Sequence, residues 1–220
     1  IEIEEKMFEA LKKHLPVNIL YDDFINGSDD KTVGIMSSSK VGPTIADDIK
    51  KNSFLAIFGS LIVVFLYILF RFRDWQYSLG AVAAVFHDVL IVLGVFSIAY
   101  TWMPFNMEIN QAFIAAILTV IGYSLNDTVV VFDRIREFRL INKSWEFKKI
   151  VNGALNSTLS RTLNTSFTTL VVLLAIFLFG GESIKGFMFA LIIGVIVGTY
   201  SSVFIATPVM YETLKKSLKK

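Results

Sequence analysis

Five long apolar runs follow one another from Phe54 almost to the end of the 220-residue chain. A helix needs about 20 mostly apolar residues to cross the roughly 30 Å hydrocarbon core of a bilayer. Each run is close to this length, and almost none of them shows the charged face that repeats along a soluble helix. We therefore predict an α-helical polytopic membrane protein with five transmembrane helices at about 54–70, 76–100, 110–133, 155–179 and 184–211.

The composition narrows the classes of function. Hydrophobic residues make up 54% of the chain, which is too much for an ordinary soluble domain. The chain has no cysteine and two histidines, which argues against a disulfide framework and against a metal site built from Cys or His. No nucleophile–base pair or phosphate-binding loop stands at a recognisable spacing. We expect neither an enzyme nor a cofactor-binding or metal-binding protein, and no nucleic-acid partner.

The positive charges between the runs predict the orientation. Lys and Arg gather after the first, third and fifth runs, whereas the segments 101–108 and 180–185 carry one Lys between them. Because loops rich in Lys and Arg stay in the cytoplasm, the N-terminal piece is expected outside and the basic tail 212–220 inside. Segment 142–154 carries Trp and Phe among lysines and is expected to form a short helix on the cytoplasmic membrane surface.

Residues 1–53 are more polar than the rest and are predicted to be a piece of an external α+β domain. Apolar residues at helical spacing predict an amphipathic helix over 2–15, which Pro16 ends. The stretches VNILYDDF (17–24) and TVGIMS (32–37) have the composition of strands. Such a piece is too short to bury a good core alone, so we expect the chain to be part of a longer polypeptide that starts upstream.

Asp127 lies inside the third apolar run, where a carboxylate costs about 2.5–3.5 kcal/mol to insert. It stands six residues beyond the midpoint of its run, about 9 Å toward the cytoplasm. Arg161 stands six residues before the midpoint of the fourth run, which crosses in the opposite direction. The two side chains are therefore predicted at the same depth, where a carboxylate between burial and a cation can exchange a proton near neutral pH.

Polar residues on both helices predict a hydrated seam around this pair. Thr119, Tyr123 and Asn126 share a face with Asp127, and the fourth run carries its own polar stripe of Thr158, Arg161 or Thr162, Thr165 and Thr169. Conduction of protons or ions is one reading of this seam. The alternatives are a fixed structural ion pair with hydroxyls joining the helices, or helix ends that place both charges in the interface.

Two further groups of residues stand out in the apolar runs. His87 and Asp88 lie near the middle of the second run, and a structural hydrogen-bonded element and a role in proton transfer are equally open for them. Gly194 and Gly198 form a G-x-x-x-G pattern in the fifth run. This pattern predicts close packing on a neighbouring helix, although glycine is also common in membrane helices in general.

Five stretches, in order and at the expected spacing, resemble the SecF family of protein-export membrane proteins. The resemblance covers about residues 41–211. The most distinctive stretch is IGYSLNDTVVVFDRIRE (121–137), and the others are VGPTIADDIKKNS (41–53), AVFHDV (84–89), SRTLNTSFTTL (160–170) and FGGESIKGF…GVIVGTYSS (179–202).

The resemblance implies an RND-type helix bundle of which this chain holds the last five of six helices, and a ferredoxin-like module for the external piece. It also implies a partner SecD, separate or fused, the SecYEG channel and an unfolded preprotein, in the bacterial inner membrane. The coupling ion is the proton, or sodium in some relatives. The family's relay carboxylate and relay arginine correspond to Asp127 and Arg161, whereas a further essential carboxylate belongs to SecD.

Two other functions stay open from the sequence. The same superfamily contains exporters of small molecules that use a similar relay, although their external domains are larger than the short polar piece expected here. The chain could also be an assembly subunit that conducts nothing, with Asp127 and Arg161 as a structural pair. Proton flux in the presence of SecD separates the second of these from a transporter.

Overall fold

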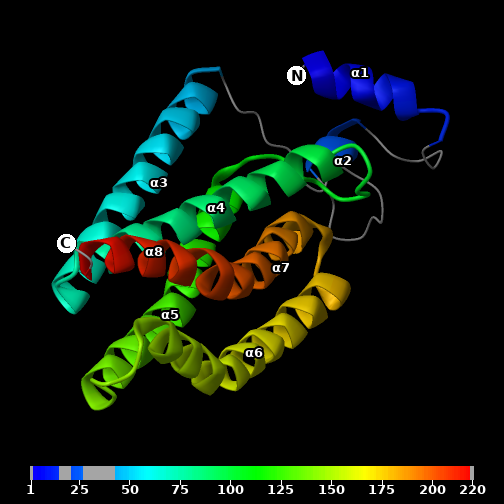
Figure 1. The fold of residues 1–220 in the computed structure, drawn as a ribbon. Coiled ribbons are helices and arrows are strands. Elements are labelled where there is room, and N and C mark those ends of the chain that lie inside the picture. Colours follow the sequence, from blue (N-terminus) through cyan, green and yellow to red (C-terminus); the bar gives the residue numbers. More distant parts are fainter. Residues whose placement is uncertain (1, 15–20, 27–42, 219–220) are drawn as a thin grey trace. The chain divides into compact units, whose positions relative to one another are not determined.

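The computed structural model describes residues 2–14, 21–26 and 43–218. In these ranges the chain is helical, with eight α-helices and one π-helical turn (Figure 1). Their bounds are α1 Glu2–Leu11, α2 Tyr21–Asn26, α3 Pro43–Phe72, α4 Trp75–Ala99, α5 Gln111–Ile141, α6 Phe147–Phe179, α7 Glu182–Ser201, η1 Ser202–Ala206 and α8 Thr207–Leu218.

Five segments are long and apolar enough to cross a membrane, which agrees with the predicted polytopic helical protein. They are Lys51–Phe72, Trp75–Ala99, Gln111–Ile141, Phe147–Phe179 and Glu182–Ser217. The third extends beyond the expected end at residue 133. Arg134 and Glu137 form an ion pair of 2.6 Å at i,i+3, which supports the helix beyond the apolar run.

The N-terminal unit contains α1 and α2. The expected amphipathic helix is present as α1, and Phe8 contacts Tyr21 and Phe24 of α2 with ring centroids 5.4 Å apart in both pairs. Tyr21–Asn26 is a helix, so the predicted strand over 17–24 is wrong in its second half. Residues 17–20 and the predicted strand 32–37 lie outside the described residues, and the described part of this unit contains no strand.

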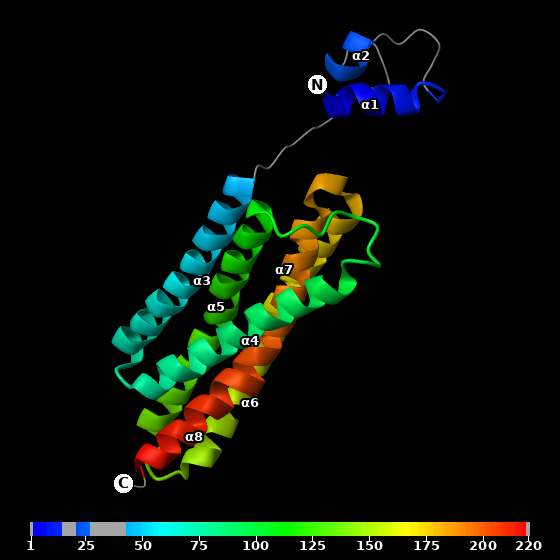
Figure 2. The ribbon, with the colours of Figure 1, turned by 90° about the horizontal axis from the view of Figure 1, so that it is seen from above.

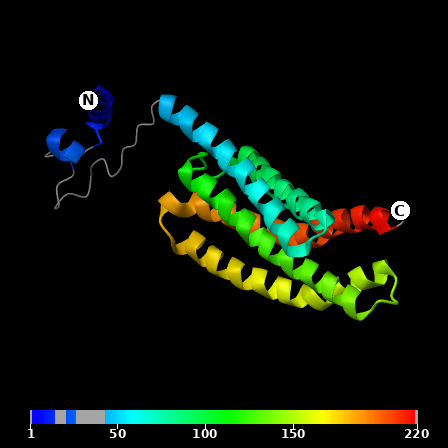
Figure 3. The same ribbon diagram turned by 90° about the vertical axis from the view of Figure 1, so that its left-hand side faces the viewer.

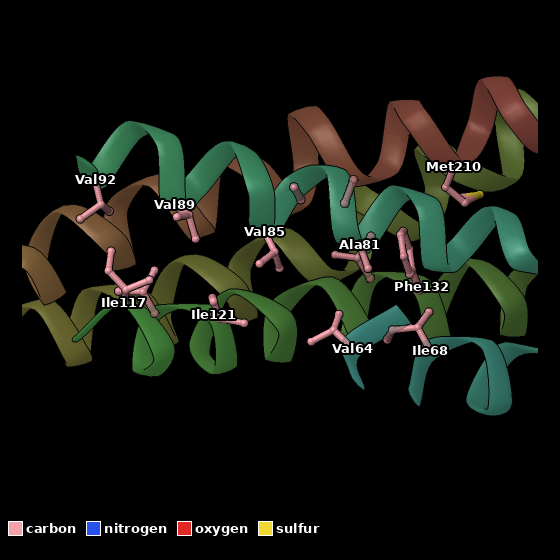
Figure 4. Close-up of a cluster of buried hydrophobic side chains, with 14 of the residues drawn as sticks. Val64, Ile68, Ala81, Val85, Val89, Val92, Ile117, Ile121, Phe132 and Met210 are labelled. Carbon is pink, nitrogen blue, oxygen red and sulfur yellow. The ribbon is translucent and has the colours of Figure 1, made fainter. Parts of the chain in front are cut away.

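The membrane-spanning unit is a bundle in which α5 and α7 make the most extensive contacts. Helix α5 packs against α4, α6 and α7, and α7 packs against the same α4 and α6 (Figures 2 and 3). The core is built from aliphatic and aromatic side chains of several helices. Figure 4 shows Val85 of α4, Ile117 and Phe132 of α5, and Val64 and Ile68 of α3 within this core.

Polar contacts tie the turn between α3 and α4 to α5. Arg71 pairs with Asp133 at 2.8 Å, and Arg139 lies 3.8 Å from Asp74. The turn closes through Arg73, whose φ of 65° lies in the left-handed region. These charges lie at the end of the bundle that also contains the α5–α6 turn and the C-terminal part of α8 (Figure 2).

Helix α6 is continuous from Phe147 to Phe179, which differs from the expected separate surface helix at 142–154. Within this segment, residues 142–146 form the connection between α5 and α6, and residues 147–154 are the first part of α6. Figure 1 shows a change of direction between the yellow-green beginning of α6 and its yellow remainder. Ser157 and Thr158 both donate to carbonyls of the preceding turn, a contact that bends helices.

The fifth span is one helical rod made of α7, η1 and α8 (Figure 1). Its π-helical turn, Ser202–Ala206, lies directly before Thr207 and Pro208. Proline has no N–H, and its ring would clash with the carbonyl four residues earlier, so a wider turn relieves the strain. The Thr207 hydroxyl donates to the carbonyl of Ser202, five residues back, at 2.9 Å.

Candidate functional site

The candidate site lies where α5 and α6 run antiparallel, side by side (Figure 3). Two contacts define their register. The Tyr123 hydroxyl reaches Thr169 Oγ1 at 3.4 Å, and Arg134 Nε donates to Ser157 Oγ at 2.9 Å. Between these two contacts, Asp127 falls opposite the turn of α6 that contains Thr162 and Ser166.

Asp127 is buried, with 5% of its surface exposed. The hydroxyl of Ser166 lies beside its carboxyl group. Its Oδ2 atom is enclosed and has no hydrogen-bond partner among the described residues, and the same holds for Thr162 Oγ1 on the facing helix. Buried polar atoms are nearly always paired. Gln76, Tyr77 and Ser78 of α4 also carry an unpaired atom, but within the described residues only at Asp127 does the unpaired atom belong to a carboxylate.

Arg161 lies one turn or less from the level of Asp127 and acts on it electrostatically. Its side chain is exposed, and no ion pair joins the two residues in the part of the chain that the structure describes. The antiparallel register puts the turns that carry the two residues at a similar level, and their pairing stays a prediction.

The other seam residues divide into two groups. Tyr123 is half-buried and its hydroxyl reaches Ser166 and Thr169 of α6, whereas on α6 Thr162 is buried and Thr165 is partly exposed. Thr119 and Asn126 are exposed instead, and Thr119 donates to the carbonyl of Ala115. Asn126 and Asp127 are neighbours, so their side chains point about 100° apart and only one can face α6.

Asp88 belongs to a second buried site, where α4, α5 and α7 meet. Its Oδ2 accepts hydrogen bonds from Ser124 at 2.6 Å and from Ser201 at 2.7 Å. Its Oδ1 lies 3.2 Å from Nδ1 of His87, whose ring is near Tyr200. The residue has no exposed surface, and both carboxylate oxygens are engaged, so the arrangement joins three helices.

Gly194 and Gly198 lie on the face of α7 that meets α5. A Cβ atom at Gly194 would overlap the side chain of Val120, and one at Gly198 would meet Ser124 Cβ at 3.0 Å. The two glycines thus lie over two residues of α5 that are themselves four apart. Close approach of the helices at this level brings Ser124 within reach of Asp88.

Sequence reasoning missed the hydroxyls that complete these sites. Ser124 and Ser201 serve Asp88, and Thr199 hydrogen-bonds Ser166 at 2.6 Å across α6 and α7. A signal for them exists in the sequence. A buried carboxylate needs donors, and small hydroxyl residues near the G-x-x-x-G pattern are the ones that can come close enough to supply them.

Comparison with known proteins gives a consistent result. Residues 23–216 match the family described as "Protein export membrane protein SecD/SecF, C-terminal". The chain is 48% identical over 211 residues to "Protein translocase subunit SecF" of Rhodothermus marinus, covering 96% of this chain and 64% of that protein. It is 47% identical over 172 residues to "Protein translocase subunit SecDF" of Brucella abortus, covering 78% of this chain and 22% of the relative.

A solved structure, "Crystal structure of SecDF in Super-membrane-facing form", aligns with a TM-score of 0.70 and 35% identity. The alignment covers 83% of this chain and 24% of that one. The chain therefore spans less than two thirds of these relatives. Because the family match extends over most of the chain, this multi-pass membrane protein belongs to the SecD/SecF family of protein-export membrane proteins.

Proposed function

We propose that the chain is the SecF-like part of a membrane complex that uses the proton motive force to help move preproteins across the bacterial inner membrane. The observation that carries the proposal is Asp127, a carboxylate buried among apolar helices with one oxygen left without a partner. Intramembrane carboxylates are expensive and usually functional. The names of the relatives, translocase subunits SecF and SecDF, support a transport role rather than an enzymatic one.

In this mechanism Asp127 takes up a proton from the outer side and releases it to the cytoplasm. The hydroxyl of Ser166 lies beside the carboxyl group and is within 3.5 Å of the Tyr123 hydroxyl, so the two can orient water or carry hydrogen bonds to it. Loss of the negative charge weakens its attraction for Arg161. Helix α6 carries that arginine, so the change of charge alters the packing of α6 against α5.

The transport mechanism also needs a partner in the membrane. Thr119 and Asn126 of α5 and Arg161, Asn164 and Thr168 of α6 are exposed on the isolated chain. A charged or strongly polar face is costly against lipid, so we assign this face to helices of a SecD-type partner, separate or fused. The partner would supply the additional carboxylate that the family uses. The SecYEG channel and an unfolded preprotein complete the assembly.

The orientation and the external domain follow from the charge pattern and the family. We place residues 1–53 outside the membrane, as the end of an α+β domain, and the C-terminal tail in the cytoplasm. In this arrangement the charged pairs Arg71–Asp133 and Arg139–Asp74 lie at the cytoplasmic end of the bundle. Movement of the helices would be transmitted to the external domain through α3, which connects it to the bundle.

The decisive experiment replaces Asp127 by Asn in the full-length protein, reconstituted with its SecD-type partner. Export of a preprotein driven by a proton gradient, and proton flux itself, should fall to background while membrane insertion is unchanged. Asp133→Asn is the matched control, because that carboxylate is also on α5 but is partly exposed and paired with Arg71. Normal export by the Asp127→Asn protein would rule out the relay, and a sodium gradient tested in parallel identifies the coupling ion.

Arg161 offers a graded version of the same test. Arg161→Ala should remove coupling, whereas Arg161→Lys keeps the charge but loses the planar group with its paired donors. We expect the lysine variant to retain part of the flux. Equal activity of the wild type, Arg161→Ala and Arg161→Lys would show that Arg161 takes no part. The role of Asp127 would then be judged from the Asp127→Asn variant alone.

A further inference from the structure

A groove runs along the line of contact between α6 and the continuous helix formed by α7, η1 and α8. It has two parts, of about 200 and about 410 Å³, which share Val203. From the α6 side the smaller part is lined by Lys148, Val151, Asn152 and Leu155. The larger part continues along the same helix with Leu159, Thr162, Leu163, Ser166, Phe167 and Leu170.

The spacing of these residues shows that they form one stripe. On α6 they recur every three or four residues, and on the opposite wall Ile196, Tyr200, Val203, Thr207 and Tyr211 do the same. The stretch of α6 from Leu155 to Leu170 is about 22 Å long at 1.5 Å per residue. One leaflet of a bilayer has a hydrocarbon thickness of about 15 Å, so the groove can hold one acyl chain.

One end of the groove is basic. The turns that surround it, 145–149 and 211–216, contain Lys148, Lys149, Lys215 and Lys216 against two glutamates. None of these lysines forms an ion pair with another described residue. Lys149 lies over the ring of Trp145 at 4.3 Å and Lys215 over that of Tyr211 at 5.3 Å, which leaves both cations at the rim.

The chemistry of the two ends matches an anionic phospholipid. Lysines beside Trp and Tyr are the side chains found at the headgroup level of membranes, and a lysine near an anionic lipid surface contributes about a fivefold gain in affinity. The larger part is lined mainly by apolar side chains, and of its polar groups the hydroxyls of Ser166 and Thr199 bond each other. The smaller part, next to the lysines, adds Asn152 and Thr207. A phosphate at Lys148 and an acyl chain along Leu159 and Leu163 would occupy both parts.

The groove is separate from the face assigned to the partner helices. At 100° per residue, Leu159, Leu163 and Phe167 lie on one flank of the α6–α5 contact, and Arg161 and Thr168 lie on the other. We propose that the groove along α6 and α7–α8 binds one anionic phospholipid, with its headgroup at Lys148 and Lys215 and one acyl chain extending to Leu163. This proposal rests on the groove and its charges. The groove shares Thr162 and Ser166 with the Asp127 site, but the lipid contacts proposed here are made by Lys148, Lys215 and the leucines of α6.

The first test measures lipid binding to the full-length protein in detergent, by native mass spectrometry or by titration. The two probes are phosphatidylglycerol and phosphatidylcholine with identical acyl chains. We expect a preference for phosphatidylglycerol that falls by about fivefold for each lysine lost in Lys148→Gln/Lys215→Gln. The control Arg73→Gln/Arg136→Gln removes two exposed charges from the same end of the bundle, at the α3–α4 turn rather than the groove, and should keep the preference. Equal binding of the two lipids, or an equal effect of both double variants, would overturn the proposal.

The second test fills the groove. Leu163 is 53% exposed, so Leu163→Trp can be accommodated without disturbing the core, and it should abolish binding of both lipids at this site. Leu90→Trp places the same ring on an exposed position of α4 and should leave binding unchanged. A photoreactive residue at 163 should crosslink to lipid in native membranes. A crosslink to a polypeptide would assign the groove to a partner helix and refute the lipid site.

Discussion

Asp88 and Asp127 are both carboxylates buried in the same bundle, yet their surroundings differ. Asp88 has donors on two other helices and a histidine beside it, so both its oxygens are occupied. Asp127 has Ser166 nearby, an arginine that does not pair with it, and one oxygen with no partner in the described chain. Burial alone therefore does not distinguish a structural carboxylate from one available for transport. The two kinds of carboxylate differ in the number of hydrogen bonds that each already accepts.

The largest expected difference is in transport. Asp127→Asn should reduce gradient-driven export by about 100-fold or more, the order of a lost proton-transfer group. Asp88→Asn should retain a clearly measurable part of the activity, because both serines donate to one oxygen of Asp88 and an amide oxygen can still accept both hydrogen bonds. Export measured at equal protein levels compares the two variants. Complete loss of activity in both would break the distinction and would bring Asp88 into the transport mechanism.

The second difference is in stability and has the opposite order. Asp88→Ala leaves the hydroxyls of Ser124 and Ser201 without their acceptor, at a cost of about 2 kcal/mol. Asp127→Ala removes a carboxylate that is not fully satisfied, so its cost should be smaller than that of Asp88→Ala. Unfolding titrations of both variants in the same detergent give the comparison. A larger loss for Asp127→Ala would mean that its partners are stronger than the geometry indicates.

The third prediction concerns the glycine that allows the Asp88 site to form. Gly198→Ala pushes on Ser124 and should cost about 1–2 kcal/mol, as overpacked sites do. Gly122→Ala is the matched control, since a Cβ there meets nothing within 4 Å and alanine favours the helix. The same unfolding titration reads both. If the two variants behave alike, the contact between α5 and α7 is looser than described.

The smallest effects are expected from the serines themselves. Ser124→Ala and Ser201→Ala should each cost about 0.6 kcal/mol, the average for a hydrogen bond between membrane helices. Ser201 also donates to the carbonyl of Gly198, which reduces what is lost. A double-mutant cycle with Asp88→Ala measures the coupling. Additive effects would show that the hydroxyls contribute nothing through the carboxylate.

The spans and the level of the polar residues could be predicted from the sequence, because apolar length and helical spacing are local properties. The matching depth of Asp127 and Arg161 followed from counting residues along antiparallel helices. The rotation of a side chain about its helix could not be obtained in this way. Asn126 and Thr119 were expected in the seam and are exposed, while Asp127 beside them is buried.

Other features that the sequence does not reveal also originate in tertiary packing. Tyr21 and Phe24 belong to a segment with strand composition, yet they lie in a helix and contact Phe8 of α1. The contacts of Asp88 with Ser124 and Ser201 join residues far apart in the chain, and the separation becomes short only when α7 packs against α5. No pattern within a single run contains that information.

The π-helical turn at Ser202–Ala206 determines which side of α8 faces the bundle. Helix α4 packs against α7 before the turn and against α8 after it. The buried side chains of both α7 and α8 must therefore face the same helix. The wider turn changes the rotation of everything that follows by roughly one residue, or about 100°. Met210 and Leu214 are buried as a result. Removing a single residue from this turn would preserve a continuous helix and rotate both side chains out of the core.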